Sequence, residues 1–345
     1  MPSLRVSAPT RIDFLGGTLD IWPLHQVLQH KATVNAAIDL RAEVTIKIRS
    51  DSQFYIRSLD QAVNFQGSFA ELRQIKPDLA LAGLIVQGLW HAKLPGLELD
   101  LRSTSPKGAG IGGSSSLAIA AAAAVLKARC REDSEPMASP EAILDWVKDM
   151  EAKLIFAPTG CQDYWGALNG GINCLRYPHG KIEVTKYSKN FFADLEAQTL
   201  IVYSGRSRFS GMNNWQIFKD VFDRRKETIA SLEKIGELAE LACKAVESKD
   251  LAKLLLLCKE EWQVRKELAP EIESPETKKI ADAAMQAGAL FARVCGAGGG
   301  GVMLIALPNP DLAKREIIAK ALVYAGAQIL PASFTDIGLL YEDFD

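Results

Sequence analysis

The chain has 345 residues, of which 48% are hydrophobic and 24% are charged, and its formal net charge is -2. This length predicts two domains, and the balanced charge argues against nucleic acid or an anionic membrane as a partner, so any anion site is local. The first ten residues lack the apolar core of a signal peptide, and the longest apolar run is about half of what a bilayer requires. The six cysteines are far apart and suit neither a disulfide framework nor a zinc site, which predicts a cytoplasmic protein.

The first half of the chain mixes predicted strands and helices. Three segments alternate apolar and polar residues, as half-buried strands do: 42–50, 53–60 and 97–104. The helical period predicts helices over 79–93 and about 115–129, and a polar surface loop follows over 130–142. Ser139 is a typical N-cap and Pro140 a typical first-turn residue, so the next helix is expected to begin there.

The second half begins with a predicted strand near 197–205. Long amphipathic helices are expected over about 215–247 and 251–268. Residues 293–308 are interpreted as a strand broken by glycines, and a helix near 311–325 and terminal strands follow. No repeat or low-complexity linker separates the halves, so two α+β domains that share a cleft are expected, with a boundary around 180–200.

The stretch SPKGAGIGGSSSLAIAAAAAVL, at 105–126, places glycines and serines directly before an alanine-rich helix. The first backbone N–H groups of a helix are unpaired and lie at its positive dipole end, and glycines let a ligand approach them. The hydroxyls of Ser114, Ser115 and Ser116 suit a helix cap, a phosphate contact or a magnesium ligand. The stretch is therefore either a phosphate loop or a serine-capped turn into a core helix.

Three glycines of this stretch also match the dinucleotide fingerprint G-x-G-x-x-G: Gly108, Gly110 and Gly113. Glu132 or Asp133 lies about 20 residues further on, where a ribose-binding acid would be. However, Pro106 and Lys107 separate the preceding strand from the glycines, and no strand is expected before the acidic residues. The Walker A pattern is absent as well, because no Gly-Lys-Ser or Gly-Lys-Thr follows the glycines. These departures favour a phosphate loop of another kind.

Two further glycine-rich segments, 7–24 and 294–307, complete a set of three. In this order the three segments resemble the GHMP kinase superfamily, and the middle one, at 106–114, carries the most specific resemblance. Within the superfamily, PTRIDFLGGTLD and the following VNAAIDLRAEVTI, at 34–46, look most like the bacterial heptose-phosphate kinases and the fucokinase-like sugar kinases. The galactokinase form has Glu-His where this chain has Gly17 and Thr18, which argues against galactose as the substrate.

The resemblance implies an α+β fold of two domains with the active site in the cleft between them. The N-terminal domain, 1–190, would be ribosomal-protein-S5-like, and the C-terminal domain, 191–345, would be ferredoxin-like. The implied activity is that of an ATP- and Mg2+-dependent sugar kinase, with a heptose 7-phosphate 1-kinase as the leading specific hypothesis. The alternatives are another GHMP kinase, which would act on fucose, galactose or an isoprenoid alcohol, the superfamily's decarboxylase, and a non-catalytic nucleotide-binding regulator. A homodimer is a further expectation.

The resemblance also assigns the residues that bind the nucleotide and the metal. The ATP loop would comprise Pro106, Lys107, Gly108, Gly110, Gly112, Gly113, Ser114 and Ser115. Ser114 and Glu151 would contact Mg2+, which prefers hydroxyl and carboxylate oxygens. The third glycine segment, 296–301, would support the nucleotide cleft and pack against the ATP loop.

Catalysis and acceptor binding are assigned in the same way. Asp163 would be catalytic, either as the base that takes the acceptor proton or as a group that only orients the acceptor hydroxyl. Arg11 would keep Asp163 ionised and stabilise charge on the transferred phosphoryl group. The acceptor-binding residues would be Gly16, Gly17, Asp20, Arg206 and Arg208, of which the last two would bind a distal phosphate.

Overall fold

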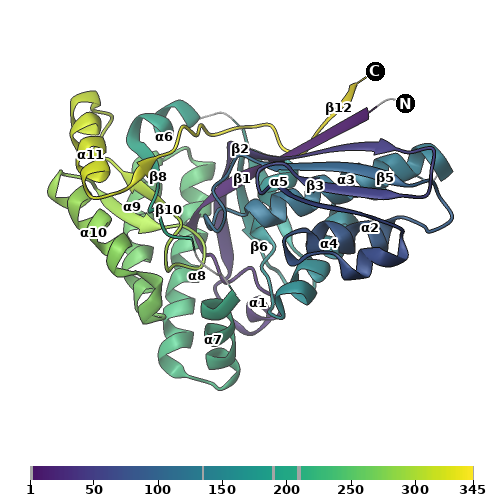
Figure 1. The fold of residues 1–345 in the computed structure, drawn as a ribbon. Coiled ribbons are helices and arrows are strands. Elements are labelled where there is room, and N and C mark those ends of the chain that lie inside the picture. Colours follow the sequence, from purple (N-terminus) through teal and green to yellow (C-terminus); the bar gives the residue numbers. More distant parts are fainter. Residues whose placement is uncertain (1–2, 134–135, 189–190, 208–210, 345) are drawn as a thin grey trace.

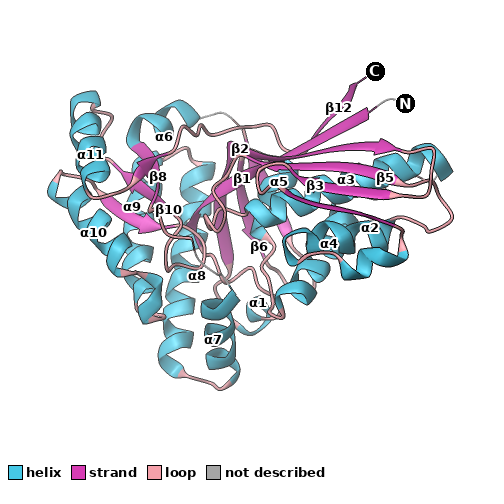
Figure 2. Ribbon diagram, in the orientation of Figure 1, coloured by secondary structure: helices cyan, strands magenta, loops and turns pink. Residues whose placement is uncertain are grey.

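Two β-sheets, each covered by helices, form the two lobes of the structure, a computed structural model that describes residues 3–133, 136–188, 191–207 and 211–344. Figure 1 shows the larger sheet in one lobe and the smaller sheet in the other, with α8 between them. Figure 2 separates the strands of the two sheets, in magenta, from the helices around them. The fold therefore has the α+β character that the sequence predicts.

The larger sheet has eight strands in the order β12-β1-β2-β5-β3-β4, and β6 and β7 continue from the first part of β2. The bounds are β1 Ser3–Leu15, β2 Ala32–Ile48, β3 Phe54–Ser58, β4 Val63–Gly67, β5 Leu97–Ser103, β6 Ile172–Arg176, β7 Glu183–Tyr187 and β12 Leu340–Phe344. The predicted strands over 53–60 and 97–104 are confirmed. The predicted start at residue 42 is wrong, because β2 begins at Ala32 with residues buried on both faces, which do not alternate in polarity.

Helices cover one face of the larger sheet (Figure 1). They are α2 Ala80–Leu89, α3 Gly113–Asp133, α4 Pro140–Ile155 and α5 Gln162–Asn169, and the short elements of this half are α1 Leu24–Val27, η1 Ala70–Gln74 and η2 Pro77–Leu79. The buried alanines of α3 let this helix lie close to β1 and β2. The predicted cap is confirmed, because Ser139 Oγ accepts a hydrogen bond from Ala142 N at 3.2 Å. The loop predicted from residue 130 is wrong at its start, since α3 continues to Asp133.

The smaller sheet is antiparallel and has the order β11-β8-β10-β9. Its strands are β8 Thr199–Tyr203, β9 Phe291–Val294, β10 Val302–Ala306 and β11 Gln328–Ile329. Ile201 and Leu304 face a core shared with β1 and β2, whereas Leu200 and Met303 face the core beneath α10 and α11, so both faces are apolar. The prediction of one glycine-broken strand is wrong, because the glycines form the turn between two paired strands, β9 and β10.

The helices of the second half are α6 Phe192–Gln198, α7 Gly211–Phe222, α8 Lys226–Glu247, α9 Leu251–Lys266, α10 Pro275–Gln286 and α11 Leu312–Tyr324, with η3 at Pro270–Ile272. The single helix predicted over 215–247 is wrong. Arg224 adopts a left-handed backbone conformation with φ 59°, and Arg225 N donates to Asp220 O at 2.9 Å, which ends α7. The helices predicted over 251–268 and 311–325 are confirmed as α9 and α11.

The last strand returns to the first sheet. Figure 1 shows β12 beside β1, and Ser3 pairs with Phe344, so the two ends of the chain are neighbours. The domain boundaries, 1–190 and 191–345, stay a prediction. β12 belongs to the second half of the chain but joins the larger sheet. The six cysteines all lie in the described ranges and form no disulfide bond there. In the described ranges, no helix combines the length and the apolar character that crossing a membrane requires.

Candidate active site

The two residues predicted to be catalytic are in direct contact. Arg11 is on β1, and Asp163 is in the first turn of α5. Arg11 Nε donates to Asp163 Oδ1 at 2.8 Å, Nη2 donates to the same oxygen, and Nη1 donates to Gly110 O at 3.0 Å. The Arg11 side chain is 4% exposed and that of Asp163 is 26% exposed, so the arginine is enclosed while the carboxylate remains accessible.

The charge of Arg11 is maintained by its neighbours. Burial acts to lower the pKa of Arg11, but the negative charges of Asp163 and Asp13 more than offset burial, so the pKa is raised. This fixed cation lies beside the Asp163 carboxyl and provides positive charge to any anion that binds next to it.

Asp20 lies in the loop after β1 and is almost completely buried. Its Oδ2 accepts a hydrogen bond from Gln162 N at 3.0 Å, at the start of α5, so Asp20 and Asp163 lie at the same helix terminus. A Cβ atom at Gly160 would lie 1.9 Å from Asp20 Oδ2, so the glycine makes room for this carboxylate. Burial, with a contribution from the charge of Asp163, raises the pKa of Asp20 to about 6.

The two glycines before Asp20 are enclosed by other parts of the chain. Gly16 has φ +79°, and a Cβ atom there would lie 2.0 Å from Ala32 O. Gly17 O accepts a hydrogen bond from Arg265 Nη2 at 2.9 Å. The loop over 16–20 is therefore held against β2 on one side and against α9 on the other.

The middle glycine stretch forms a tight loop that ends at the N-terminus of α3. Gly108, Gly110 and Gly112 have φ of 68°, 74° and 78°, which other residues rarely adopt. A Cβ atom at Gly112 would lie 3.2 Å from the Asp163 side chain, so the loop abuts the predicted catalytic carboxylate. The dinucleotide alternative is wrong, because α4 rather than a strand follows α3 and β5 pairs antiparallel with β2.

Glu151, on α4, is buried against the start of α3. Its Oε2 accepts hydrogen bonds from Ser115 Oγ at 2.8 Å and Tyr164 Oη at 2.5 Å, and the Ser114 hydroxyl also bonds to this carboxyl. Burial raises the pKa of Glu151, although the bonds from Ser114, Tyr164 and Ser115 act in the opposite direction. Hydroxyl and carboxyl oxygens thus meet at the helix N-terminus, and this donor set fits Mg2+. Three or more His, Cys, Asp or Glu side chains do not gather anywhere in the described chain in a way that would hold a metal by themselves.

The third glycine segment packs against the middle loop, as predicted. Val302 N donates to Ala109 O at 2.7 Å, and a Cβ atom at Gly301 would lie 2.3 Å from the same oxygen. The second lobe therefore contacts the glycine loop directly through the turn between β9 and β10.

Two side chains that are predicted to contact phosphate, those of Lys107 and Arg206, bond to surface groups of the protein in this structure. Lys107 Nζ donates to Gln61 Oε1 at 2.8 Å and to Asp78 Oδ1 at 2.9 Å on the surface. Arg206 Nη1 donates to Glu276 Oε2 at 2.7 Å. Pro106 remains in the loop, where its carbonyl oxygen accepts a hydrogen bond from Ala109 N at 3.1 Å. Arg208 lies outside the described residues.

Four charged residues beneath this site and one tyrosine within it are not predicted from the sequence. The charged residues are Asp13, Glu261, Arg265 and Arg293, and the tyrosine is Tyr164. Glu261 and Arg265 are four residues apart on α9, a spacing typical of a surface ion pair. Only the position of Asp13 inside the first glycine motif distinguishes it in the sequence.

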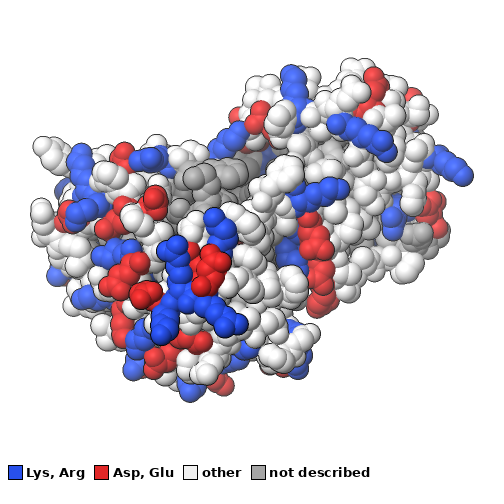
Figure 3. All heavy atoms as spheres, turned by 90° about the horizontal axis from the view of Figure 1, so that it is seen from below, with Lys and Arg blue, Asp and Glu red and all other residues white. Residues whose placement is uncertain are grey.

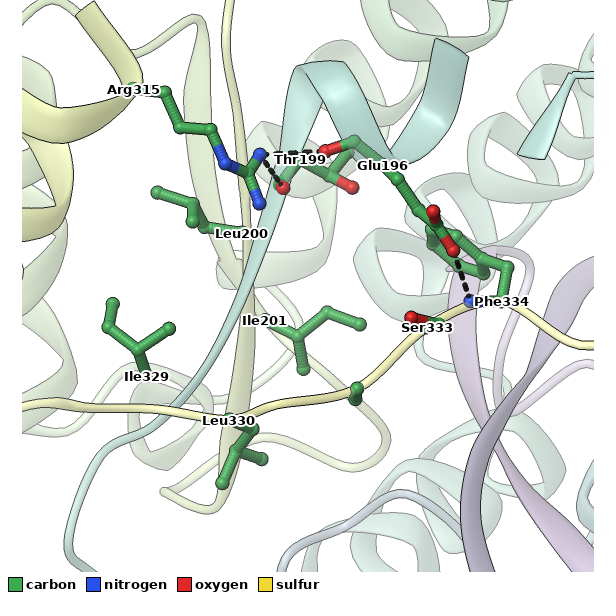
Figure 4. Close-up of a pocket in the computed structure, with 10 residues that line it drawn as sticks. Glu196, Thr199, Leu200, Ile201, Arg315, Ile329, Leu330, Ser333 and Phe334 are labelled. Carbon is green, nitrogen blue, oxygen red and sulfur yellow. Dashed lines mark hydrogen bonds between the residues drawn. The ribbon is translucent and has the colours of Figure 1, made fainter. Parts of the chain in front are cut away.

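A cavity of about 160 Å³ lies away from these residues, between β8, α11 and the segment over 329–334 (Figure 4). Arg315 Nη1 donates there to Glu196 O at 2.7 Å and to Thr199 O. None of the predicted site residues that the structure describes lines this cavity. On the face shown in Figure 3, basic and acidic side chains are interspersed over both lobes.

Comparison with known proteins identifies relatives of this chain. Residues 80–171 match the model of the GHMP kinases N terminal domain, and residues 231–324 match that of the GHMP kinases C terminal, so together they span more than half of the chain. The chain is 26% identical to D-glycero-alpha-D-manno-heptose 7-phosphate kinase of Campylobacter jejuni, over 98% of both chains. It is 27% identical to mevalonate kinase of Pyrococcus abyssi, over 99% of both.

The fold is shared with solved structures as well. A D-glycero-D-manno-heptose 1-phosphate kinase from Bacteroides thetaiotaomicron superimposes with a TM-score of 0.78 and 19% identity, over 98% of both chains. At this identity the likeness shows the fold alone. The two-domain fold that the glycine motifs imply is therefore confirmed.

Proposed function

We propose that this chain, which belongs to the GHMP kinase family and is accordingly an ATP-dependent phosphotransferase, transfers the γ-phosphoryl group to a hydroxyl of a phosphorylated monosaccharide. The observation that carries the proposal is the contact of Arg11 and Asp163 at the edge of the glycine loop, beside the buried Asp20. Arg11 fixes the carboxylate of Asp163 near the glycine loop, and the carboxylate of Asp20 would accept hydrogen bonds from the acceptor.

Each group has a distinct part in the proposed reaction. The backbone N–H groups at the start of α3 and the glycines before them would bind the triphosphate. Asp163 would accept the proton of the attacking hydroxyl or orient that hydroxyl, and Arg11 would balance the charge that develops on the phosphoryl group. Asp20 would accept hydrogen bonds from neighbouring hydroxyls of the acceptor.

Glu151 and Ser114 would hold Mg2+ together with the nucleotide. Among the described residues, neutral hydroxyls bond to this buried carboxyl and no arginine or lysine does, so a bound cation would supply the missing positive charge. When it is bound, Mg2+ neutralises charge on the phosphates. Ser115 already donates to Glu151 and would keep this carboxyl oriented toward Ser114.

The narrower proposal for the acceptor is a heptose 7-phosphate, phosphorylated at its 1-hydroxyl. It is supported by the name of the Campylobacter jejuni relative and by Arg206, whose backbone lies against the glycines of the third segment. For a distal phosphate to bind, Arg206 would exchange Glu276 for the phosphate, which a half-exposed ion pair permits at low cost. Mevalonate is the alternative, because the Pyrococcus abyssi relative has similar identity. Action in the cytoplasm and assembly as a homodimer belong to the same proposal.

A coupled ADP-release assay tests the acceptor. The panel comprises heptose 7-phosphate, free heptose, free hexoses, fucose and mevalonate, each with and without Mg2+. Turnover that requires both Mg2+ and the 7-phosphate is the expected result. Turnover of free heptose at the same kcat/KM would contradict the distal phosphate site, and turnover of mevalonate alone would replace the sugar by an isoprenoid alcohol.

A further inference from the structure

Four completely buried charges form a continuous chain beneath the active site. Glu261 and Arg265 come from α9, Arg293 from β9 and Asp13 from β1. Their side chains are 0–3% exposed, and two cations balance two anions. Isolated charges are costly to bury, so such a group persists only when each member is paired and hydrogen-bonded.

The chain can be followed contact by contact. Arg265 Nη2 donates to Gly17 O at 2.9 Å, and Arg265 is held by Glu261 Oε1 at 2.8 Å from Nε and 2.5 Å from Nη2. Glu261 Oε2 is 3.2 Å from Arg293 Nη1, and Arg293 Nη2 is 3.3 Å from Asp13 Oδ2. Asp13 Oδ1 then accepts a hydrogen bond from Gly296 N at 2.7 Å.

The two ends of this chain are the two glycine segments of the active site. One end is Gly17, in the loop that carries Asp20, and the other is Gly296, at the start of the segment that packs on Ala109 of the middle loop. Arg293 also donates to Phe14 O, which fixes the end of β1 immediately before the loop. The charged chain therefore joins the acceptor loop to the second lobe.

The loop over 16–20 needs such support, because its backbone is not intrinsically stable. Gly16 and Thr18 both have positive φ, 79° and 77°, and Thr18 carries the steric cost of a branched side chain there. Arg265 contributes a charge-assisted hydrogen bond to the residue between them. This bond aligns Gly17 and thus the direction in which the chain continues to Asp20.

We propose that Arg265 is a positioning residue for the acceptor: held by Glu261, it fixes the Gly17 carbonyl and so keeps the loop that carries Asp20 in its binding conformation. The proposal rests on the acceptor role of Asp20 in the proposed function. It assigns no role in ATP binding, because the middle glycine loop is bonded to Arg11 and Val302 instead.

Steady-state kinetics of two variants test this. R265K keeps the buried positive charge beside Glu261, but its single ammonium lacks the second arm that reaches Gly17. E261Q/R265M removes one charge of each sign and leaves Asp13 and Arg293 as a balanced pair. R315M is the matched control, since Arg315 also bonds to backbone carbonyls (Figure 4) but is on α11, beside a cavity that no described site residue lines.

We expect both variants to raise the acceptor KM about 10-fold, the factor for losing one hydrogen bond to a charged group, with the KM for ATP changed less than about 2-fold. R315M should leave both KM values unchanged. An equal rise of both KM values, or unchanged KM values in folded R265K and E261Q/R265M, would overturn the proposal.

Amide hydrogen exchange gives a readout that needs no acceptor. In R265K and E261Q/R265M, exchange should accelerate over 16–20 and remain at the parent rate over 108–116. Parent-like exchange over 16–20 would overturn the positioning role even if no sugar is phosphorylated, whereas failure of the acceptor panel alone concerns only the proposed function.

Discussion

Buried carboxylates in two regions of this protein have opposite electrostatic surroundings. Asp20 and Glu151 accept hydrogen bonds from neutral donors, and burial raises the pKa of both. Asp13 is buried as deeply, but the charges of Arg293 and Arg11 overcome the effect of burial and lower its pKa. The difference lies in the partners that the protein supplies.

The protein supplies cations that balance the charge of Asp13. In the proposed function, Asp20 and Glu151 would instead be stabilised by a bound ligand. Asp13 already has its cations, so it contributes to stability and gains nothing from a further partner. In the described chain, Asp20 and Glu151 accept hydrogen bonds from neutral donors, and the charge of Arg11 does not overcome the effect of burial on Asp20. The charged forms of both would be stabilised by the hydroxyls of an acceptor or by a metal ion. Asp163 has properties of both groups, because it has a cation on one oxygen and is partly open.

The largest effect is expected for D163N. The variant removes the charge that would accept or orient the acceptor proton, so kcat should fall by about 10²–10⁴. ATP affinity should change little, because Arg11 keeps its bond to Gly110 O. ADP release and calorimetric ATP titration measure the two quantities, with D145N on the exposed face of α4 as the control. Activity within about tenfold of the parent would remove Asp163 from the proposed catalytic role.

D13N and D20N should change stability in opposite directions. D13N leaves a net buried positive charge and should lower the free energy of unfolding by about 3–5 kcal/mol. The pKa of Asp20 is raised from 3.8 to about 6, so its ionisation destabilises the fold as pH rises through this window, and D20N should gain up to about 3 kcal/mol at pH 8.

Urea unfolding at pH 8 and at pH 4 measures the contrast between these two variants. The gain of D20N should fall to about 0.5 kcal/mol at pH 4, where Asp20 is almost fully protonated in the folded protein and close to half protonated in the unfolded protein. Destabilisation by both variants at pH 8 would show that the charge of Asp20 stabilises the fold, as that of Asp13 does, and would contradict the contrast.

Much of the candidate active site could be predicted from the sequence, because its elements are local. The glycine loop, its serines and the following helix are contiguous, and Asp163 is identified by its neighbours in a short motif. The contact of Arg11 with Asp163 spans 152 positions, but each residue lies in a recognisable motif. Patterns of this kind also locate most strands and helices.

The supporting structure could not be predicted in the same way. Arg265 and Gly17 are 248 positions apart, and Arg293 and Asp13 are 280 apart, so nothing local marks them as partners. Glu261 and Arg265 have the spacing of a surface pair, but the packing of α9 against α8, β1 and β9 buries them. The pairing of β12 with β1 is equally non-local, since the five residues of β12, LYEDF, contain no information on their partner.

The smallest expected effect is the pH dependence of acceptor binding. Because the pKa of Asp20 is about 6, the carboxylate is lost as pH falls through 6, and kcat/KM for the acceptor should decline about 10-fold for each unit below it. Asp163 and Arg11 are the charged groups that face Asp20, and the neighbouring Cys161 remains protonated because burial raises its pKa.

Two variants assign this decline to Asp20. D20N should have a lower kcat/KM with no inflection near pH 6. H25Q should keep the inflection, because burial lowers the pKa of His25 and the imidazole is stacked on Tyr177 rather than bonded to Asp20. If H25Q loses the inflection and D20N retains it, the titrating group is the imidazole. The charged form of Asp20 is then stabilised by partners within the protein, as that of Asp13 is.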